Sequence, residues 1–116
     1  MLVAVNSAGG VQGQERRASP RIPIVMWVEE RSEQGRYFRR SGNLSRGGLR
    51  LDHTIPLPIG TVVHLSFTLP GDTSPVEVAA RIVSAAAGEA LGMGVTFVEV
   101  SAEAQARIDG FLERSA

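Results

Sequence analysis

Apolar and polar residues alternate with a two-residue period over much of the chain, as expected for β-strands with one buried face. Valine, isoleucine and leucine recur at every second position in several short stretches, separated by sequences rich in glycine, proline and serine. Short strands joined by tight turns are typical of antiparallel barrels and sandwiches. The predicted strands span residues 22–28, 36–41, 49–52, 61–69, 76–82 and 91–97, and GNLSRGG at 42–48 is predicted to be a turn.

The end of the chain has a helical period instead. Ser101 can cap a helix whose apolar residues recur at i, i+4, i+7 and i+8. These residues are Ala104, Ile108, Phe111 and Leu112. We expect this single amphipathic helix to pack against the sheet.

The composition is that of one small globular domain. A chain of 116 residues can bury a core without disulfides or metal, and the absence of cysteine excludes thiolate sites and a cysteine nucleophile. Residues 1–14, rich in Gly, Ser, Asn and Gln, are expected to be a flexible segment, and residues 15–116 to form the domain. The first ten residues lack the basic and long apolar regions expected of a secretory signal, and no apolar run reaches the roughly 18 residues that a membrane span needs. We therefore expect a cytoplasmic protein without membrane insertion.

Charge is distributed unevenly although the net charge is zero. Residues 16–50 hold nine arginines against three acids, whereas residues 51–116 hold three arginines against eight acids. A neutral chain is not expected to bind nucleic acid by general attraction. The first region is instead expected to attract a specific anion, because arginine binds phosphate with two hydrogen bonds and stacks on flat rings.

The sequence does not suggest an enzyme. His53 and His64 are the only histidines, and His64, between two apolar strand residues, is expected to be exposed. Asp52 and His53 are adjacent in a strand and would point to opposite faces, so they cannot easily form a catalytic pair. We predict no catalytic residue, no metal site and no cofactor.

Two short motifs account for the arginines. RASPR at 17–21 contains Arg-x-x-x-Arg just before the first strand, and NLSRGG at 43–48 contains Asn-x-Ser-x-x-Gly after the second strand. Arg17 and Arg21 could be solvated loop residues, and Asn43 and Ser45 could simply form a hairpin turn. The occurrence of both motifs in this order favours a shared site.

With these motifs the sequence resembles the PilZ domain family, the bacterial receptors for the second messenger cyclic di-GMP. The GMGVTF strand at 92–97 and the C-terminal helix also resemble that family. The resemblance covers roughly residues 15–114 and implies a six-stranded antiparallel β-barrel with a C-terminal α-helix. It further implies a receptor or adaptor that transmits the second-messenger level to an unidentified protein partner.

The resemblance also implies a set of ligand-binding residues, for which the chemistry is suitable. Arginine can bind the phosphates or guanine O6 and N7, while an amide or hydroxyl oxygen can accept from guanine N1 and N2. Glycine allows turn geometry and close approach of the ligand. The predicted cyclic di-GMP site contains Arg16, Arg17, Arg21, Asn43, Ser45, Gly47 and Gly48. Because three clustered arginines can balance more than one ligand, we expect two molecules per chain.

Two other functions remain possible. A PilZ-like adaptor that binds no nucleotide would use the same fold, and a small RNA-binding barrel would need exposed aromatics along a basic strip. Most of the six aromatics lie at core-like positions, and Trp27 in particular is expected to lie in the core or cover the barrel. Arg39 and Arg40 are expected to be solvated, and Arg46 either solvated or in a specific contact.

Overall fold

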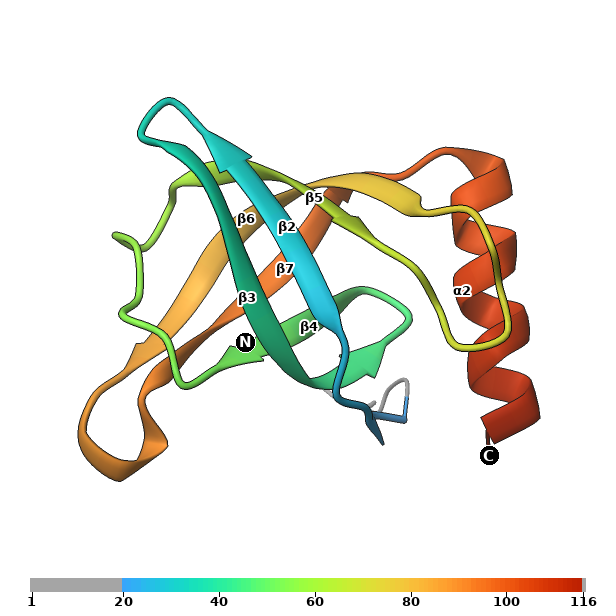
Figure 1. The fold of residues 1–116 in the computed structure, drawn as a ribbon, viewed down its shortest axis with the longest axis horizontal. Helices are drawn as coiled ribbons and strands as arrows, with labels where there is room; N and C mark the ends of the chain where they lie inside the picture. The colour runs from blue at the N-terminus through green and yellow to red at the C-terminus, as the bar shows by residue number, and fades with distance from the viewer. Residues whose placement is uncertain (1–19, 116) are drawn as a thin grey trace, which may run out of the picture.

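The strands form a closed barrel with one helix beside it (Figure 1). The computed structural model describes residues 20–115. All strand pairs are antiparallel, in the order β1-β3-β2-β5-β6-β7-β4, and a further β3–β4 pairing closes the sheet. Because β1 and β2 follow one another along the same edge of β3, they fill one strand position, and the predicted six-stranded antiparallel barrel with a C-terminal helix is confirmed. The elements are β1 (Ile22–Pro23), β2 (Trp27–Ser32), β3 (Gly35–Ser45), β4 (Gly48–Asp52), β5 (Val62–Phe67), β6 (Val76–Ala86), a 3-10 turn η2 (Gly88–Ala90), β7 (Gly92–Glu99) and α2 (Ala102–Ser115).

The first predicted strand is divided into β1 and β2, which follow one another along the same edge of β3. A serine side chain fills the interruption. The Ser41 hydroxyl donates to the Ile24 carbonyl at 2.6 Å and accepts from the Met26 N–H at 3.0 Å. These bonds satisfy backbone groups that would otherwise lack a partner at the break. The interruption therefore leaves the barrel wall closed.

Strand β3 contains one extra residue at Gly42, where its register against β4 shifts. Side chains alternate between the two faces of a regular strand, so residues 40 and 43 would normally face opposite sides. The bulge places both Arg40 and Asn43 on the outer face and keeps Leu44 in the core. Residues 42–45 thus continue the strand, and only Arg46 and Gly47 form the turn. The predicted turn at 42–48 is wrong for its first four residues and for Gly48, which begins β4.

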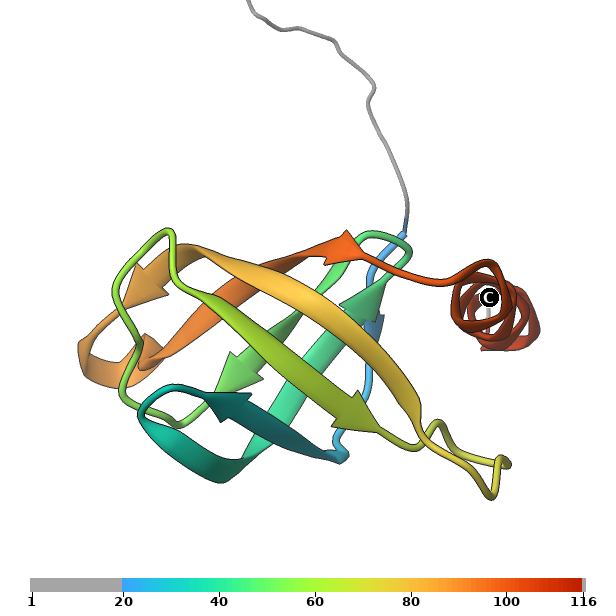
Figure 2. The same ribbon diagram turned by 90° about the horizontal axis from the view of Figure 1, so that it is seen from above.

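Helix α2 packs against one end of the barrel (Figure 2). The Ala104 N–H donates to the Ser101 hydroxyl at 3.1 Å, so the predicted N-cap is present. The helix buries Ala104, Ile108 and Leu112, one stripe of its surface, in the same core as the barrel strands.

One aromatic side chain that we expected to lie in the core or to cover the barrel is exposed on the surface. Trp27 is 65% exposed on the outer face of β2, because the next residue, Val28, takes the inward position. Phe38 and Tyr37 on β3 are also exposed. Three of the six aromatics therefore face solvent, and the sequence-based reason for disfavouring an RNA-binding barrel is wrong.

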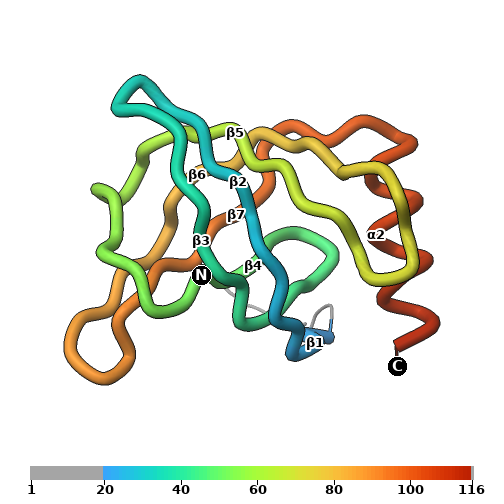
Figure 3. Tube along the Cα trace, viewed as in Figure 1, coloured from blue at the N-terminus to red at the C-terminus, as the bar shows by residue number. Residues whose placement is uncertain are grey.

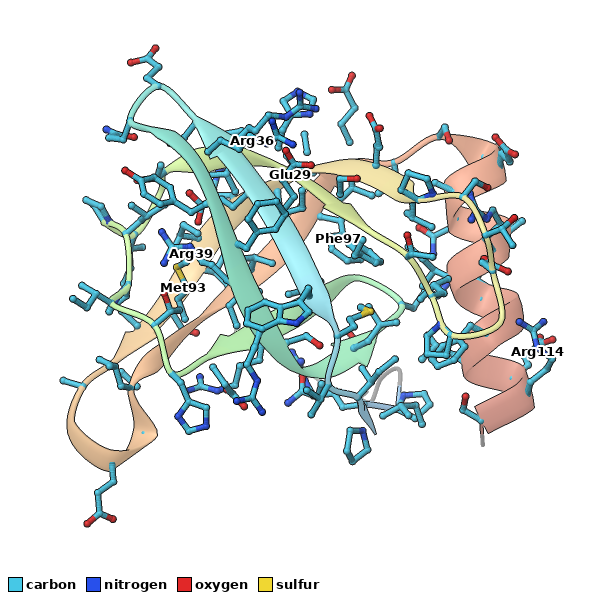
Figure 4. All side chains as sticks on the ribbon, in the orientation of Figure 1. Glu29, Arg36, Arg39, Met93, Phe97 and Arg114 are labelled. Atoms are coloured by element: carbon cyan, nitrogen blue, oxygen red, sulfur yellow. The ribbon has the colours of Figure 1, made fainter. Side chains whose placement is uncertain are left out.

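Arg39 is also placed differently from the prediction, because it lies inside the barrel wall rather than in solvent (Figure 4). It pairs across the strands with Val28 and so shares the inward face with Glu30, which is fully buried. The Arg39 guanidinium donates to Glu30 Oε1 and to the Thr54 hydroxyl. Glu30 Oε2 has no hydrogen-bond partner among the described residues. Arg40, as predicted, is exposed.

Gly48, the first residue of β4, is required for a reason other than the predicted turn geometry. A Cβ there would lie 2.1 Å from the carbonyl oxygen of Val95 in β7, and its backbone is not left-handed. Close packing of two strands, rather than turn geometry, therefore requires glycine. A Cβ added at the neighbouring Gly47 would meet no atom within 4 Å.

The buried ion pair leads to a prediction for Arg39→Met. This change keeps an unbranched apolar stem but leaves the Glu30 carboxylate buried without its cation, which costs about 3–5 kcal/mol. We expect urea denaturation to show a loss of about 3 kcal/mol in the free energy of unfolding. The double variant Glu30→Met/Arg39→Met should recover most of this loss. An equal loss in both variants would mean that packing, and not the unpaired charge, sets the cost.

The two neighbouring glycines lead to a second prediction. Gly48→Ala should lower the free energy of unfolding by about 2–3 kcal/mol, because the new methyl group forces β4 away from β7. Gly47→Ala should change it by less than about 0.5 kcal/mol. Urea denaturation of the two variants side by side measures the difference, and equal stabilities would contradict the packing role of Gly48.

Candidate functional site

The two sequence motifs meet on the outer surface of the barrel. Arg21 precedes β1, which pairs with the end of β3 through Pro23 opposite Asn43. The Arg21 guanidinium donates from Nη1 to Asn43 Oδ1 at 2.7 Å. Figure 3 shows β1 on the same side of the barrel as the turn between β3 and β4. The structure therefore brings together one residue of each motif, as a shared site requires.

The charge on Arg21 is not neutralised by this contact. Four of the arginines in the same half of the chain form ion pairs with carboxylates, whereas the partner of Arg21 is an uncharged amide. Its guanidinium is exposed and has further N–H groups to donate. Asn43 uses its oxygen toward Arg21, and its Nδ2 group donates to no described residue. Within residues 20–115 no carboxylate pairs with Arg21, so the pair offers a positive charge and amide donors on this surface.

Ser45 is placed beside Asn43 on the outer side of β3 but is largely buried. Its hydroxyl donates to the Gly48 carbonyl across the turn at 3.3 Å. In this structure the hydroxyl therefore closes the turn. The oxygen of this hydroxyl keeps its lone pairs while it donates, so the predicted role as a hydrogen-bond acceptor for guanine stays compatible with the bond to Gly48.

The two glycines of the motif differ in their surroundings. Gly47 is exposed at the tip of the turn, and its carbonyl accepts from the Phe97 N–H at 2.8 Å. Gly48 is buried, and the space beside its Cα is taken by the Val95 carbonyl. From the sequence alone, a ligand was expected to approach there.

One arginine within the second motif, Arg46, and one just after it, Arg50, make contacts that were not predicted from the sequence. Arg50 pairs across the strands with Asn43, and its guanidinium donates to Asp52 at 2.7 Å and to the Ala90 carbonyl. Arg46, at the tip of the turn, forms an ion pair with Asp109 of α2. The outward position of Arg50 could have been found from the sequence, because side chains alternate along β4. No sequence signal pointed to the partner of Arg46, because Asp109 lies 63 residues away.

Arg16 and Arg17, the other predicted arginines of the site, lie outside the described residues. Within residues 20–115, no cluster of three or more histidine, aspartate or glutamate side chains could hold a metal ion. None of the helices in this part of the chain has the length and apolar character needed to cross a membrane. His64 is exposed, as predicted.

Comparison with known proteins identifies the family. The sequence profile described as PilZ domain matches residues 15–114. The fold is similar to that of the Bacillus subtilis inhibitor of motility, MotI/DgrA, with a TM-score of 0.74 and 21% identity. That match covers 87% of this chain and 51% of MotI, so the chain spans about half the length of that protein. No curated protein sequence matches the chain.

Two further solved structures are similar. The PilZ domain of YcgR from Escherichia coli, solved with c-di-GMP, has a TM-score of 0.69 and 16% identity over 87% of this chain and 92% of that one. The PilZ domain of CeSA from a cellulose-synthesizing bacterium has a TM-score of 0.62 and 23% identity over 83% and 97%. At these identities the structures show the shared fold alone. Because the family profile covers residues 15–114, the chain belongs to the PilZ domain family, whose members are regulatory cyclic di-GMP receptors and adaptors rather than enzymes.

Proposed function

We propose that this PilZ domain is a cyclic di-GMP receptor that binds its ligand on the outer face of β1 and β3. The observation that carries the proposal is the 2.7 Å hydrogen bond between Arg21 and Asn43, which joins the two motifs in a single exposed site. An arginine held by a neutral amide keeps its charge for an anionic ligand.

The chemistry of the site suits both parts of a cyclic dinucleotide. Arg21, with Arg16 and Arg17 from the preceding segment, would bind the two phosphates or the guanine O6 and N7 atoms. The Asn43 amide lies beside Arg21 and supplies donors as well as an acceptor. Ser45, Gly47 and Gly48 would hold the turn in the shape that presents Asn43. Their contribution to affinity would be mainly indirect.

The receptor would act as an adaptor that passes the second-messenger level to a protein partner. A PilZ domain that serves only as an adaptor, without nucleotide, is the alternative. The exposed charge of Arg21 favours the receptor, because an adaptor that binds no anion gains nothing from an unneutralised arginine at this position. A direct titration separates the two functions.

The first binding prediction concerns the ligand itself. Isothermal titration calorimetry should show cyclic di-GMP binding at micromolar or tighter dissociation constants, about −8 kcal/mol or more favourable. GTP and GMP should bind far more weakly, because each offers one purine. The same titration gives the stoichiometry, which we expect to be two ligands per chain. The absence of heat and of a thermal shift at several hundred micromolar ligand would favour the nucleotide-free adaptor.

The second binding prediction concerns Arg21→Ala. Losing a charged contact to phosphate costs about 2–3 kcal/mol, so the dissociation constant should rise by roughly 30- to 150-fold. The melting temperature should hardly change, because the side chain is exposed. Arg31→Ala is the matched control, an exposed arginine of β2 opposite Arg36 at the far end of the β2–β3 hairpin. Equal binding by the two variants would rule out a specific role for Arg21.

A further inference from the structure

The turn that carries the second motif is attached to the C-terminal helix. Arg46, at the tip of the β3–β4 turn, donates from Nε to both carboxylate oxygens of Asp109 at 3.1 and 3.2 Å. The Gln105 amide of α2 donates to the Arg46 carbonyl at 3.2 Å and to Asp109 Oδ1 at 2.9 Å. Both the side chain and the backbone of Arg46 are therefore held by α2.

Arg46 also adjoins the proposed ligand site. It follows Ser45 directly and lies two residues before Gly48, and its side chain is 63% exposed. In Figure 2 the described chain begins beside the β3–β4 turn, with α2 next to it. Arg46 thus lies at the boundary between the site and the helix. Its guanidinium is bound by a carboxylate, an oxyanion of the same kind as a phosphate.

We propose that Arg46 is a further ligand-binding arginine, and that Asp109 occupies it until the ligand arrives. This inference rests on the proposed cyclic di-GMP site. A phosphate of the ligand would replace the Asp109 carboxylate on the guanidinium, so that binding breaks the ionic contact between the turn and α2.

Such an exchange has a low energetic cost. The Asp109 side chain is 31% exposed and still accepts from Gln105 after Arg46 leaves, so the carboxylate is not left buried without a partner. An ion pair as exposed as this one contributes little to stability. The ligand therefore competes with a weak internal anion.

The helix would remain attached through its other contacts. On its opposite side, Arg107 donates to Asp72 in the β5–β6 loop at 3.0 Å and also to the Ser74 and Pro75 carbonyls. The buried stripe of Ala104, Ile108 and Leu112 keeps α2 against the barrel. Ligand binding would thus break the ionic contact on one side of α2, where the Gln105 bond to the Arg46 carbonyl remains, while the other side stays held. The helix surface around Asp109 would change in response to the ligand.

A double-mutant cycle tests the inference, with cyclic di-GMP as the probe in calorimetry. Asp109→Asn removes the competing charge and should tighten binding about two- to fivefold, the range expected for an exposed ion pair. Arg46→Gln should weaken binding about three- to tenfold. In the Arg46→Gln background, Asp109→Asn should have no effect, which distinguishes unmasking of Arg46 from the general removal of a negative charge. Asp72→Asn, which breaks the other ion pair of α2, should leave affinity unchanged.

Each other outcome overturns the inference. If Asp109→Asn does not tighten binding, or tightens it equally without Arg46, the carboxylate does not mask this arginine. If Asp72→Asn and Asp109→Asn tighten binding equally, docking of the helix, and not Arg46, opposes the ligand. If the parent binds and Arg46→Gln binds equally well, Arg46 does not contact ligand, and the proposed function stands. If neither the parent nor any variant binds, the proposed function is wrong and this inference falls with it.

Discussion

The extra residue at Gly42 is the constraint on which the candidate site depends. Strand β3 must pair with β1 and β2 on one edge and with β4 on the other, and its inward side chains must fill the core throughout. Without the bulge, a regular alternation would direct Asn43 into the barrel if Arg40 faced solvent. The bulge allows the strand to close the barrel and also to present Asn43 beside Arg21. The carboxylate of Asp52 fills the space that a Cβ at Gly42 would need.

The arginines of the chain divide between internal ion pairs and exposed charge. Arg39 neutralises a buried glutamate, Arg36 pairs with Glu29 on the outer surface (Figure 4), and Arg50 pairs with Asp52. Much of the positive excess predicted from the sequence is thus compensated locally. Arg31 and Arg40 are exposed and form no ion pair among the described residues either, but Arg21 is held by Asn43, a neutral side chain of the second motif. The contact between the motifs, and not the count of arginines, therefore locates the site.

Much of the fold could be predicted from the sequence because alternation and turn composition act locally. The β5 strand and the helix capped by Ser101 both follow their sequence patterns. Alternation places Trp27 and Val28 on opposite faces but does not state whether the outer face is covered, and so Trp27 was expected to lie in the core or to cover the barrel although it is exposed. Arg39 was misplaced because a buried charge depends on a partner, and only the strand register places Glu30 diagonally across from Arg39 on the same inward face. The contact between Arg46 and Asp109 depends on the docking of α2, which no local pattern encodes.

The surroundings of Gly48 have a consequence for comparing members of the family. Its missing side chain makes room for a backbone carbonyl of the same chain, a requirement of the fold that exists whether or not a nucleotide ever binds. A homologue that had lost its ligand would still need glycine at this position to close the barrel. The glycine can therefore identify the architecture but cannot diagnose the receptor. The residues equivalent to Arg21 and Asn43 should distinguish homologues that bind the nucleotide from homologues that do not.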